Sequence, residues 1–141
     1  MAPTIDENRA RLREVGLRVT TPRLAVLSVL TQGGHYTADE LTDAVRDRIG
    51  AVSIQAVYDV LAVLVGTGLA RVFEPAGHAR LYEARAGDNH HHLVCRGCGR
   101  IEDVDCAVGA APCLTPTGTR GFDLGEAEIT WWGVCPACRA A

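Results

Sequence analysis

The sequence lacks any long apolar run, and this absence limits the class of protein it can encode. No uninterrupted apolar stretch approaches the length of about 20 residues that a membrane-spanning helix needs. The first residues carry charges where a signal peptide has an apolar core. We therefore expect a cytoplasmic protein without a membrane partner, in a compartment that keeps thiols reduced.

Lysine is also absent, so that all fourteen basic residues are arginine. The net charge of −3, taken alone, argues mildly against nucleic-acid binding. The charge is unevenly distributed, however, because residues 8–30 hold five arginines and one acidic residue, whereas the last 61 residues hold five arginines and eight acidic residues. A basic N-terminal patch on an acidic body is compatible with a DNA-binding surface, and also with a solvated helix face.

The composition is that of a folded protein with room for one ordinary domain or two small ones. Hydrophobic residues make up 48% of the 141 residues and charged residues 22%. Residues 84–88 are small and polar and include a glycine, which is typical of a hinge. We expect one domain over residues 1–83, a hinge over 84–88 and a second domain over 89–141.

The first half predicts short helices followed by a β-hairpin. Four stretches with helical apolar spacing, each preceded by a capping residue or followed by glycine, are found at 7–15, 22–30, 38–46 and 54–65. Thr37 with Glu40 three residues later is a capping box, and Ser53 precedes the fourth stretch. Segments 69–74 and 80–83 alternate like strands around a Pro-Ala-Gly turn. This order predicts a winged helix-turn-helix. The alternative is a small helical domain whose polar face is exposed to solvent and binds no DNA.

In a winged helix, the helix before the hairpin enters the major groove of DNA, because that groove is wide enough to admit it. The corresponding helix here is Ser53–Val65. Its outward residues are Ser53, Gln55, Tyr58 and Asp59. Of these we predict Ser53, Gln55 and Tyr58 as DNA contacts, since hydroxyl and amide groups bind bases and phosphates.

The second half contains two C-x-x-C pairs, Cys95 with Cys98 and Cys135 with Cys138, among predicted strands at 91–95, 100–105 and 128–134. Two such pairs far apart in sequence predict a structural Zn²⁺ site. The alternative of two redox dithiols would require a thioredoxin-like βαβ context that the sequence lacks. The remaining cysteines, Cys106 and Cys113, are interpreted as buried or spare thiols, with redox activity as the alternative.

Three consecutive histidines, His90, His91 and His92, precede the first cysteine pair. On a strand, His90 and His92 would point to one face and His91 to the other. Two imidazoles on one face can share a divalent metal ion. A histidine run alone is a weak signal, because such runs also occur by chance.

Taken together, these features resemble the ferric uptake regulator (Fur) family of bacterial repressors. The resemblance covers nearly the whole chain and rests on G-L-R-V-T-T-P-R at 16–23, H-Y-T-A-D-E-L at 35–41, V-S-I-Q-A-V-Y at 52–58, N-H-H-H-L-V-C-R-G-C-G at 89–99 and the closing G-V-C-P-A-C. Within the family, A-V-Y-D-V-L and D-V-D-C-A-V-G-A-A-P-C-L look most like the peroxide-sensing group that controls catalase-peroxidase genes.

The resemblance implies an α+β protein: an N-terminal winged helix-turn-helix followed by a small α/β dimerisation domain with the four-cysteine zinc site. It implies a homodimer that binds double-stranded operator DNA, with Arg18 at the family's minor-groove contact. It also implies a regulatory metal, whose ligands fall on His35, Glu83, His90, His92 and Asp103. This sulfur-free set suits Fe²⁺ or Mn²⁺, and Zn²⁺ is expected to compete for it in a purified protein.

The sequence departs from the family pattern in three respects. Asp59 stands where the family often has arginine, which should shift base reading toward the neighbouring residues. Residues 108–120 contain glycine and proline where the family has a helix, so we expect a loop or a short turn. Asn89, Ala110 and Ala127 occupy positions of an accessory metal site, which predicts two metal ions per protomer and not three.

The sequence thus predicts a metal-dependent transcriptional repressor that leaves its operator when peroxide oxidises its iron site. One alternative is a regulator of ferrous-iron level without peroxide chemistry. A less favoured alternative is a zinc-dependent hydrolase that uses the histidine–carboxylate site. We expect no enzyme, because Arg18 and the helix beginning at Ser53 indicate a DNA reader.

Overall fold

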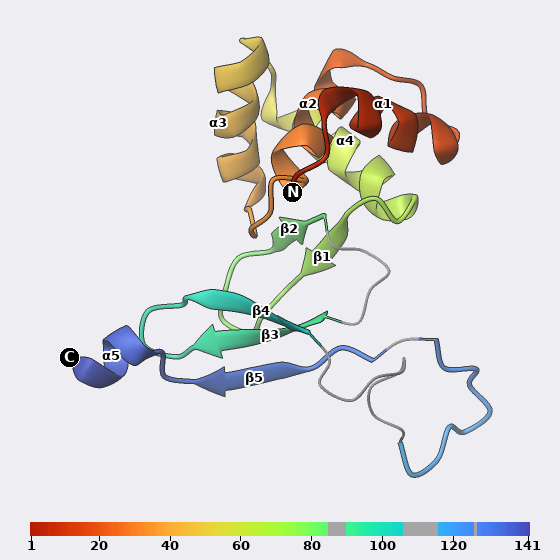
Figure 1. The fold of residues 1–141 in the computed structure, drawn as a ribbon. Coiled ribbons are helices and arrows are strands. Elements are labelled where there is room, and N and C mark those ends of the chain that lie inside the picture. The colour runs from red at the N-terminus through yellow and green to blue at the C-terminus, as the bar shows by residue number, and fades with distance from the viewer. Residues whose placement is uncertain (85–89, 106–115, 126) are drawn as a thin grey trace. The chain divides into compact units, whose positions relative to one another are not determined.

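The computed structural model describes residues 1–84, 90–105, 116–125 and 127–141, without the side chains of His90 and Asp105. It divides into two compact units, Met1–Gly87 (unit 1) and Asp88–Ala141 (unit 2). Among the described residues, unit 1 contains four helices and a hairpin, and unit 2 contains a three-stranded sheet and a short helix (Figure 1). The α+β class expected from the sequence is confirmed.

The helices of unit 1 are α1 (Ile5–Glu14), α2 (Thr21–Leu30), α3 (Ala38–Ile49) and α4 (Ile54–Gly66). Each begins after a residue whose side-chain oxygen accepts an N–H of the first turn, namely Thr4, Thr20, Thr37 and Ser53. The capping box predicted at Thr37 and Glu40 is confirmed. α1 starts two residues earlier than expected, because Thr4 and Glu7 form a second capping box.

The hairpin of unit 1 consists of β1 (Arg71–Phe73) and β2 (Leu81–Glu83), which pair antiparallel with Val72 opposite Tyr82. β1 is shorter than the predicted strand at both of its ends. The segment before α3 is bound to β2, because the N–H of Tyr36 donates to the carbonyl of Tyr82 at 3.0 Å and the N–H of Tyr82 donates to the carbonyl of Tyr36 at 2.8 Å. This pairing brings the residue before Tyr36 beside the residue after Tyr82.

Apolar side chains from all four helices form the core of unit 1. Leu12, Leu27, Leu41 and Leu61, one from each helix, are fully or almost fully buried. A polar residue also enters this interior, where the side-chain amide of Asn8 donates to Thr31 Oγ1 at 3.0 Å. In the described part of the chain no single helix is long and apolar enough to cross a membrane, and only α3 and α4 taken together, bent by 105°, reach that length and composition.

The sheet of unit 2 contains β3 (His90–Cys95), β4 (Ile101–Asp105) and β5 (Thr130–Gly133) in the order β4-β3-β5 (Figure 1). β3 pairs antiparallel with β4 and parallel with β5. The three strands were expected near these positions, whereas α5 (Pro136–Ala140) was not. Cys106, Cys113 and residues 108–115 of the expected loop lie outside the described residues, as does the hinge after residue 84.

Candidate metal centres and nucleic-acid interface

The four cysteines of the C-x-x-C pairs lie together in unit 2. One sulfur atom from each of Cys95, Cys98, Cys135 and Cys138 lies within 4.8 Å of all the others. The sulfurs of Cys98 and Cys135 are 3.7 Å apart. Four thiolates at the usual Zn–S distance of about 2.3 Å, placed at the corners of a tetrahedron, are separated by about 3.8 Å. The cluster therefore has the composition and the spacing that a structural Zn²⁺ requires.

Backbone N–H groups stabilise negative charge on this cluster. The N–H of Cys135 donates to the sulfur of Cys95 at 3.2 Å, and that of Gly97 donates at 3.3 Å. These bonds, with that from Cys135 the largest cause, lower the pKa of Cys95 to about 6. The N–H of Cys138 likewise lowers the pKa of Cys135. The neighbouring sulfurs, Cys135 first, raise the pKa of Cys138 to about 12, so a dication at the centre would have to displace its proton.

Gly97 is a residue of this site that the sequence analysis did not single out. It lies in the turn between Cys95 and Cys98, and a Cβ atom there would lie 3.0 Å from the sulfur of Cys138. A side chain at this position would therefore require the Cys138 sulfur to shift by a few tenths of an ångström. The signal was present in the sequence, since the second intervening residue of C-R-G-C is glycine.

In unit 1, the predicted regulatory residues His35 and Glu83 are neighbours. His35 Nε2 lies 2.8 Å from Glu83 Oε2, and the Glu83 side chain is only 2% exposed. The two-way backbone pairing of Tyr36 with Tyr82 holds these residues together. The ring of Phe73 on β1 packs against the His35 imidazole at a centroid distance of 6.2 Å. The result is a histidine–carboxylate pair with little access to water.

In unit 2, the predicted regulatory residues His92 and Asp103 face each other across β3 and β4. They are register partners, with His92 Nε2 3.5 Å from Asp103 Oδ1, and His92 is fully buried. Glu128, which the sequence analysis did not assign to the site, lies 3.9 Å from the other ring nitrogen of His92. Parallel pairing of β5 with β3 brings it there, and that pairing could not be read from the sequence. The side chain of the fifth predicted ligand, His90, lies outside the described residues.

The middle histidine of the run has a different environment. His91 is 1% exposed and packs edge-on against Trp131, with ring centroids 5.7 Å apart. Its Nδ1 accepts the N–H of Ile129 at 3.1 Å. Nδ1 therefore carries no proton, and the imidazole acts as a structural acceptor that attaches β5 to β3.

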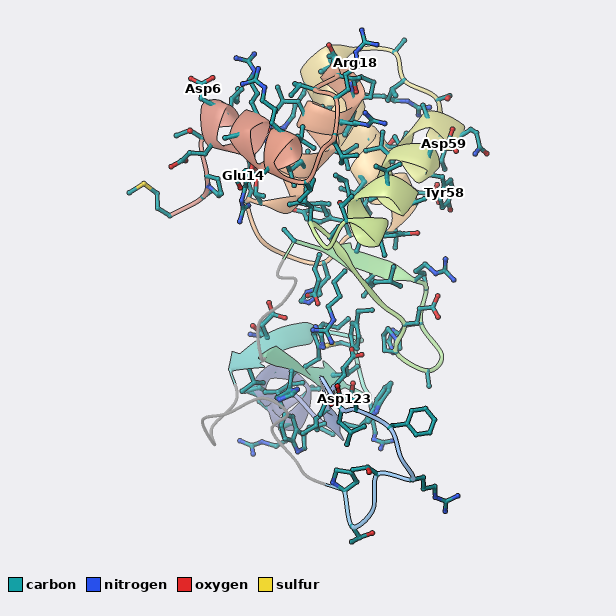
Figure 2. The ribbon with its side chains drawn as sticks, turned by 90° about the vertical axis from the view of Figure 1, so that its right-hand side faces the viewer. Asp6, Glu14, Arg18, Tyr58, Asp59 and Asp123 are labelled. Carbon is teal, nitrogen blue, oxygen red and sulfur yellow. The ribbon has the colours of Figure 1, made fainter. Side chains whose placement is uncertain are left out.

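The predicted DNA contacts belong to unit 1. Arg18 is exposed in the segment after α1, and Tyr58 and Asp59 extend outward from α4 (Figure 2). The hydroxyl of Ser53 accepts the N–H of Ala56, so its structural role is to cap α4. Gln55 is exposed one turn before Asp59, and its Nε2 donates to Asp59 Oδ1 at 2.9 Å.

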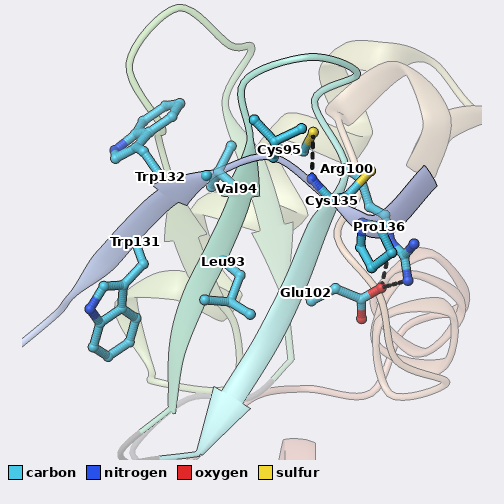
Figure 3. A pocket seen from close by; sticks show the side chains of 11 residues that line it. Leu93, Val94, Cys95, Arg100, Glu102, Trp131, Trp132, Cys135 and Pro136 are labelled. Carbon is cyan, nitrogen blue, oxygen red and sulfur yellow. Dashed lines mark hydrogen bonds and ion pairs between the residues drawn. The ribbon is translucent and has the colours of Figure 1, made fainter. Parts of the chain in front are cut away.

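Unit 2 also has an apolar cavity of about 270 Å³ near its cysteine cluster (Figure 3). The exposed side chains of Leu93 and Trp131 lie on its wall, together with an ion pair between Arg100 and Glu102 at 2.6 Å. No residue of the predicted regulatory set lines this cavity. The cavity is therefore a feature separate from the histidine–carboxylate pairs.

Comparison with known proteins places the chain in a family. The model of the ferric uptake regulator family matches residues 14–129. The "Transcriptional regulator FurA" of Mycobacterium tuberculosis is 51% identical over 135 residues, covering 96% of this chain and 92% of that protein. The "Peroxide-responsive repressor PerR" of Staphylococcus epidermidis is 27% identical over 141 residues, covering 96% of this chain and 90% of that protein.

Among solved structures, the ferric uptake regulator Fur of Helicobacter pylori, described as having three functional metal binding sites, has a TM-score of 0.72. It is 24% identical and covers 99% of this chain and 97% of that one, so this likeness supports the fold. The helical unit, the paired cysteines and the histidine–carboxylate pairs thus accompany a family match over most of the chain. The protein belongs to the ferric uptake regulator family, and it is a metal-responsive transcriptional regulator and not an enzyme.

Proposed function

We propose that this protein is a repressor that binds operator DNA as a homodimer, and that one regulatory metal ion joins unit 1 to unit 2. The observation that carries the proposal is that each unit contains a histidine beside a carboxylate, with one member of each pair buried. These pairs are His35 with Glu83 at 2.8 Å and His92 with Asp103 at 3.5 Å. Burying the Glu83 carboxylate costs free energy that a cation can offset, and Asp103 offers a carboxylate oxygen beside the buried His92, so each pair is suited to be half of a metal site.

The donor atoms indicate which metal ions the site accepts. The proposed ligands are His35, Glu83, His90, His92 and Asp103, and none of them provides sulfur. Imidazole and carboxylate donors suit Fe²⁺ and Mn²⁺, and Zn²⁺ binds such donors at least as strongly, so metal availability selects among them. We assign Zn²⁺ as a structural ion to the four cysteines, because closed tetrahedral thiolate sites are typical of structural zinc.

Ligands drawn from both units explain how a metal ion can regulate DNA binding. A metal ion shifts a conformational equilibrium only by binding one arrangement more tightly than the others. Ligation by His35 and Glu83 from unit 1 and by His92 and Asp103 from unit 2 would be complete in one arrangement only. Moving the population from about 1% to about 99% of the binding-competent arrangement requires about 5.5 kcal/mol of differential affinity.

The DNA-reading surface is α4 with its cap and the basic segment before α2. We propose that Gln55 and Tyr58 reach base edges and that Ser53, at the helix N-terminus, lies near a phosphate. Arg18 would enter the minor groove or contact the backbone beside it. A homodimer presents two such helices, which suits an operator with two related half-sites.

Operator binding at controlled metal occupancy tests this proposal. DNA selected from random duplexes by the Mn²⁺-loaded protein provides the operator, and affinity is then measured with zinc retained and Mn²⁺ varied. We expect Mn²⁺ to raise operator affinity by at least about 100-fold. His92→Ala should retain its zinc and its dimeric state but lose this response. A protein that binds DNA equally well with and without Mn²⁺ would contradict the proposal.

Metal analysis addresses the number of sites. Asn89, Ala110 and Ala127 replace the ligands that the family resemblance associates with an accessory site, and we propose two metal ions per protomer. Saturated protein should therefore contain one zinc ion in the cysteine cluster and one further ion. A third tightly bound ion would show that other residues have restored the accessory site.

Release by peroxide is a second candidate function. The observation that favours it is Asp103 beside His92, since the resemblance associates a carboxylate at this position with peroxide sensors. The higher identity to a FurA than to a PerR favours regulation by metal level.

If peroxide is sensed through iron, dilute peroxide should abolish operator binding of the Fe²⁺-loaded protein and spare the Mn²⁺-loaded protein. Mass spectrometry should then find added oxygen on His35 or His90, whereas oxidation confined to Cys106 or Cys113 would indicate a thiol switch.

A further inference from the structure

α4 carries a hydrogen-bonded pair of side chains on its exposed face. Gln55 Nε2 donates to Asp59 Oδ1 at 2.9 Å, and both residues are exposed together with Tyr58. The opposite face, with Val57, Val60, Leu61 and Leu64, is buried in the core of unit 1. Residues four positions apart lie above one another on a helix, so the bond bridges one turn of the outer face.

The carboxylate fixes which end of the Gln55 amide faces it. An ionised carboxylate only accepts hydrogen bonds, whereas a glutamine amide has a donating nitrogen and an accepting oxygen of nearly equal size. Oxygen against oxygen would be repulsive, so Nε2 must face Asp59. The amide oxygen and the second N–H are left to face away from the carboxylate. A glutamine without this neighbour would exchange the two ends by rotating about its last bond.

Fixing the amide changes which base it can read. Adenine presents an acceptor, N7, and a donor, the N6 amino group, in the major groove, and an amide pairs with both. Guanine presents two acceptors, N7 and O6, at the corresponding positions. A freely rotating amide can turn its NH₂ group toward guanine. An amide held by Asp59 would instead place its oxygen, or the carboxylate itself, against a guanine acceptor.

We infer that Asp59 is a specificity-determining residue, which locks the Gln55 amide in the orientation that accepts adenine and rejects guanine. This inference rests on the proposed function, because it requires α4 to read the major groove. In this role an acidic residue can serve a DNA-reading surface. Asp59 repels phosphates and lowers affinity for all sequences, but it raises discrimination at one base pair.

Asp59 lowers overall DNA affinity but raises discrimination at one base pair, so its replacement should change these two quantities in opposite directions. Asp59→Asn keeps the shape of the side chain but removes the charge and the requirement for Nε2. Overall DNA affinity should rise by several-fold, because one repulsive charge is lost. The preference for adenine over guanine at one position should fall by about tenfold, the lower end of what a bidentate contact contributes.

The experiment uses the full-length, zinc- and Mn²⁺-loaded protein. Its operator is selected from random duplexes, and every single base-pair variant of that operator is then measured in competition. Wild type, Asp59→Asn, Gln55→Ala and the double variant form a mutant cycle. Asp43→Asn is the matched control, since Asp43 is an exposed carboxylate on α3, 3.9 Å from Arg46 and outside the proposed reading face.

The expected result is a loss of adenine preference at the same base pair in Asp59→Asn and in Gln55→Ala. The double variant should lose no more preference than Gln55→Ala alone, because Asp59 acts through Gln55. Asp43→Asn should leave all preferences unchanged. If Asp59→Asn alters affinity uniformly and keeps every base preference, the inference is wrong while the proposed function survives. If the wild-type protein selects no operator with metal bound, both the inference and the proposed function are overturned.

Discussion

Unit 1 and unit 2 are stabilised by different kinds of interaction. The described part of unit 1 buries sixteen apolar side chains, most of them from the four helices, whereas the described part of unit 2 buries only Val94 and Cys95. Unit 2 leaves Leu93, Trp131 and Val134 exposed and encloses His91 and His92 instead. The first unit should therefore be stable through hydrophobic burial, and the second should depend on the metal ion at its cysteines.

This difference suits the proposed division of roles. A DNA-reading unit with its own apolar core keeps the outer face of α4 in a fixed geometry whether or not metal is bound. The structure of a unit that is held together by metal–ligand bonds depends on the supply of metal. The two units can be followed separately by spectroscopy. Both tryptophans of the chain, Trp131 and Trp132, lie in unit 2, whereas the four long helices lie in unit 1.

Of the changes that should affect one unit and spare the other, zinc removal should have the largest effect. Structural zinc sites contribute an apparent free energy of about 10–16 kcal/mol at neutral pH. Cys98→Ser should therefore lose zinc and unfold unit 2, with loss of the dimer, while unit 1 stays helical. Tryptophan fluorescence would report the unfolding of unit 2 and far-ultraviolet circular dichroism the helices. Cys113→Ser is the control and should retain zinc. A Cys98→Ser protein that stays dimeric with unchanged fluorescence would show that the cysteine cluster has no structural role.

A cavity in the core of unit 1 should produce the reverse pattern. Leu61 on α4 is 1% exposed, and truncating a buried leucine to alanine costs about 2–5 kcal/mol. Leu61→Ala should lower the midpoint of the helical transition in urea and leave zinc content and tryptophan fluorescence unchanged. Ile54→Ala, at a 39% exposed position of the same helix, should cost much less. Equal losses in the two variants would mean that α4 is not anchored by its buried face.

A smaller change tests the geometry of the cysteine cluster. A Cβ at Gly97 would lie 3.0 Å from Cys138 Sγ, whereas a Cβ at Gly133 meets nothing within 4 Å. Gly97→Ala should weaken zinc binding by about 10-fold to 100-fold, the range typical of changes just outside the ligand shell. Gly133→Ala serves as the control on β5. Competition with a zinc-binding dye measures both, and equal affinities would mean that the turn adapts without moving the sulfur.

The smallest effect concerns a single surface charge. Arg18→Ala should weaken binding to all operators and reduce the salt dependence of binding by about one counterion unit. The stability of each unit should be the same as in the wild-type protein. Arg9→Ala is the control, because Arg9 is engaged with Asp6 at 3.1 Å on α1. Affinity measured over a series of salt concentrations distinguishes the two variants. A change in preference among operator sequences, without a change in slope, would make Arg18 a base reader.

The sequence was most informative where the structure depends on local signals. Thr20, Thr37 and Ser53 cap helices as predicted, because a cap depends only on the residues of the first turn. The cysteine cluster was also predictable, since the spacing within each pair matches the geometry of a metal-binding turn. The short helix α5 was missed because five residues carry too little periodicity to be recognised.

The sequence was least informative where segments far apart in the chain meet. Placing Glu128 3.9 Å from His92 requires the parallel pairing of β5 with β3, and no local pattern specifies that partner. The same pairing explains why His91 is buried against Trp131. The Gln55–Asp59 bond is local and was readable as a pair four residues apart on a helix, although its chemical consequence depends on how the amide is oriented.

The most direct test of the central claim, that one ion is shared by the two units, is the stoichiometry and affinity of Mn²⁺ binding to the zinc-loaded protein. Wild type, His35→Ala, His92→Ala and the double variant are compared by calorimetry, with His78→Ala as a control outside the ligand set. We predict one Mn²⁺ per protomer in wild type. Each single variant should lower the affinity by at least about 10-fold, and the double variant should lower it by less than the sum of the two free-energy losses. Two Mn²⁺ ions per protomer, with one lost in each single variant, would show that the histidine–carboxylate pairs are separate sites and would contradict the account.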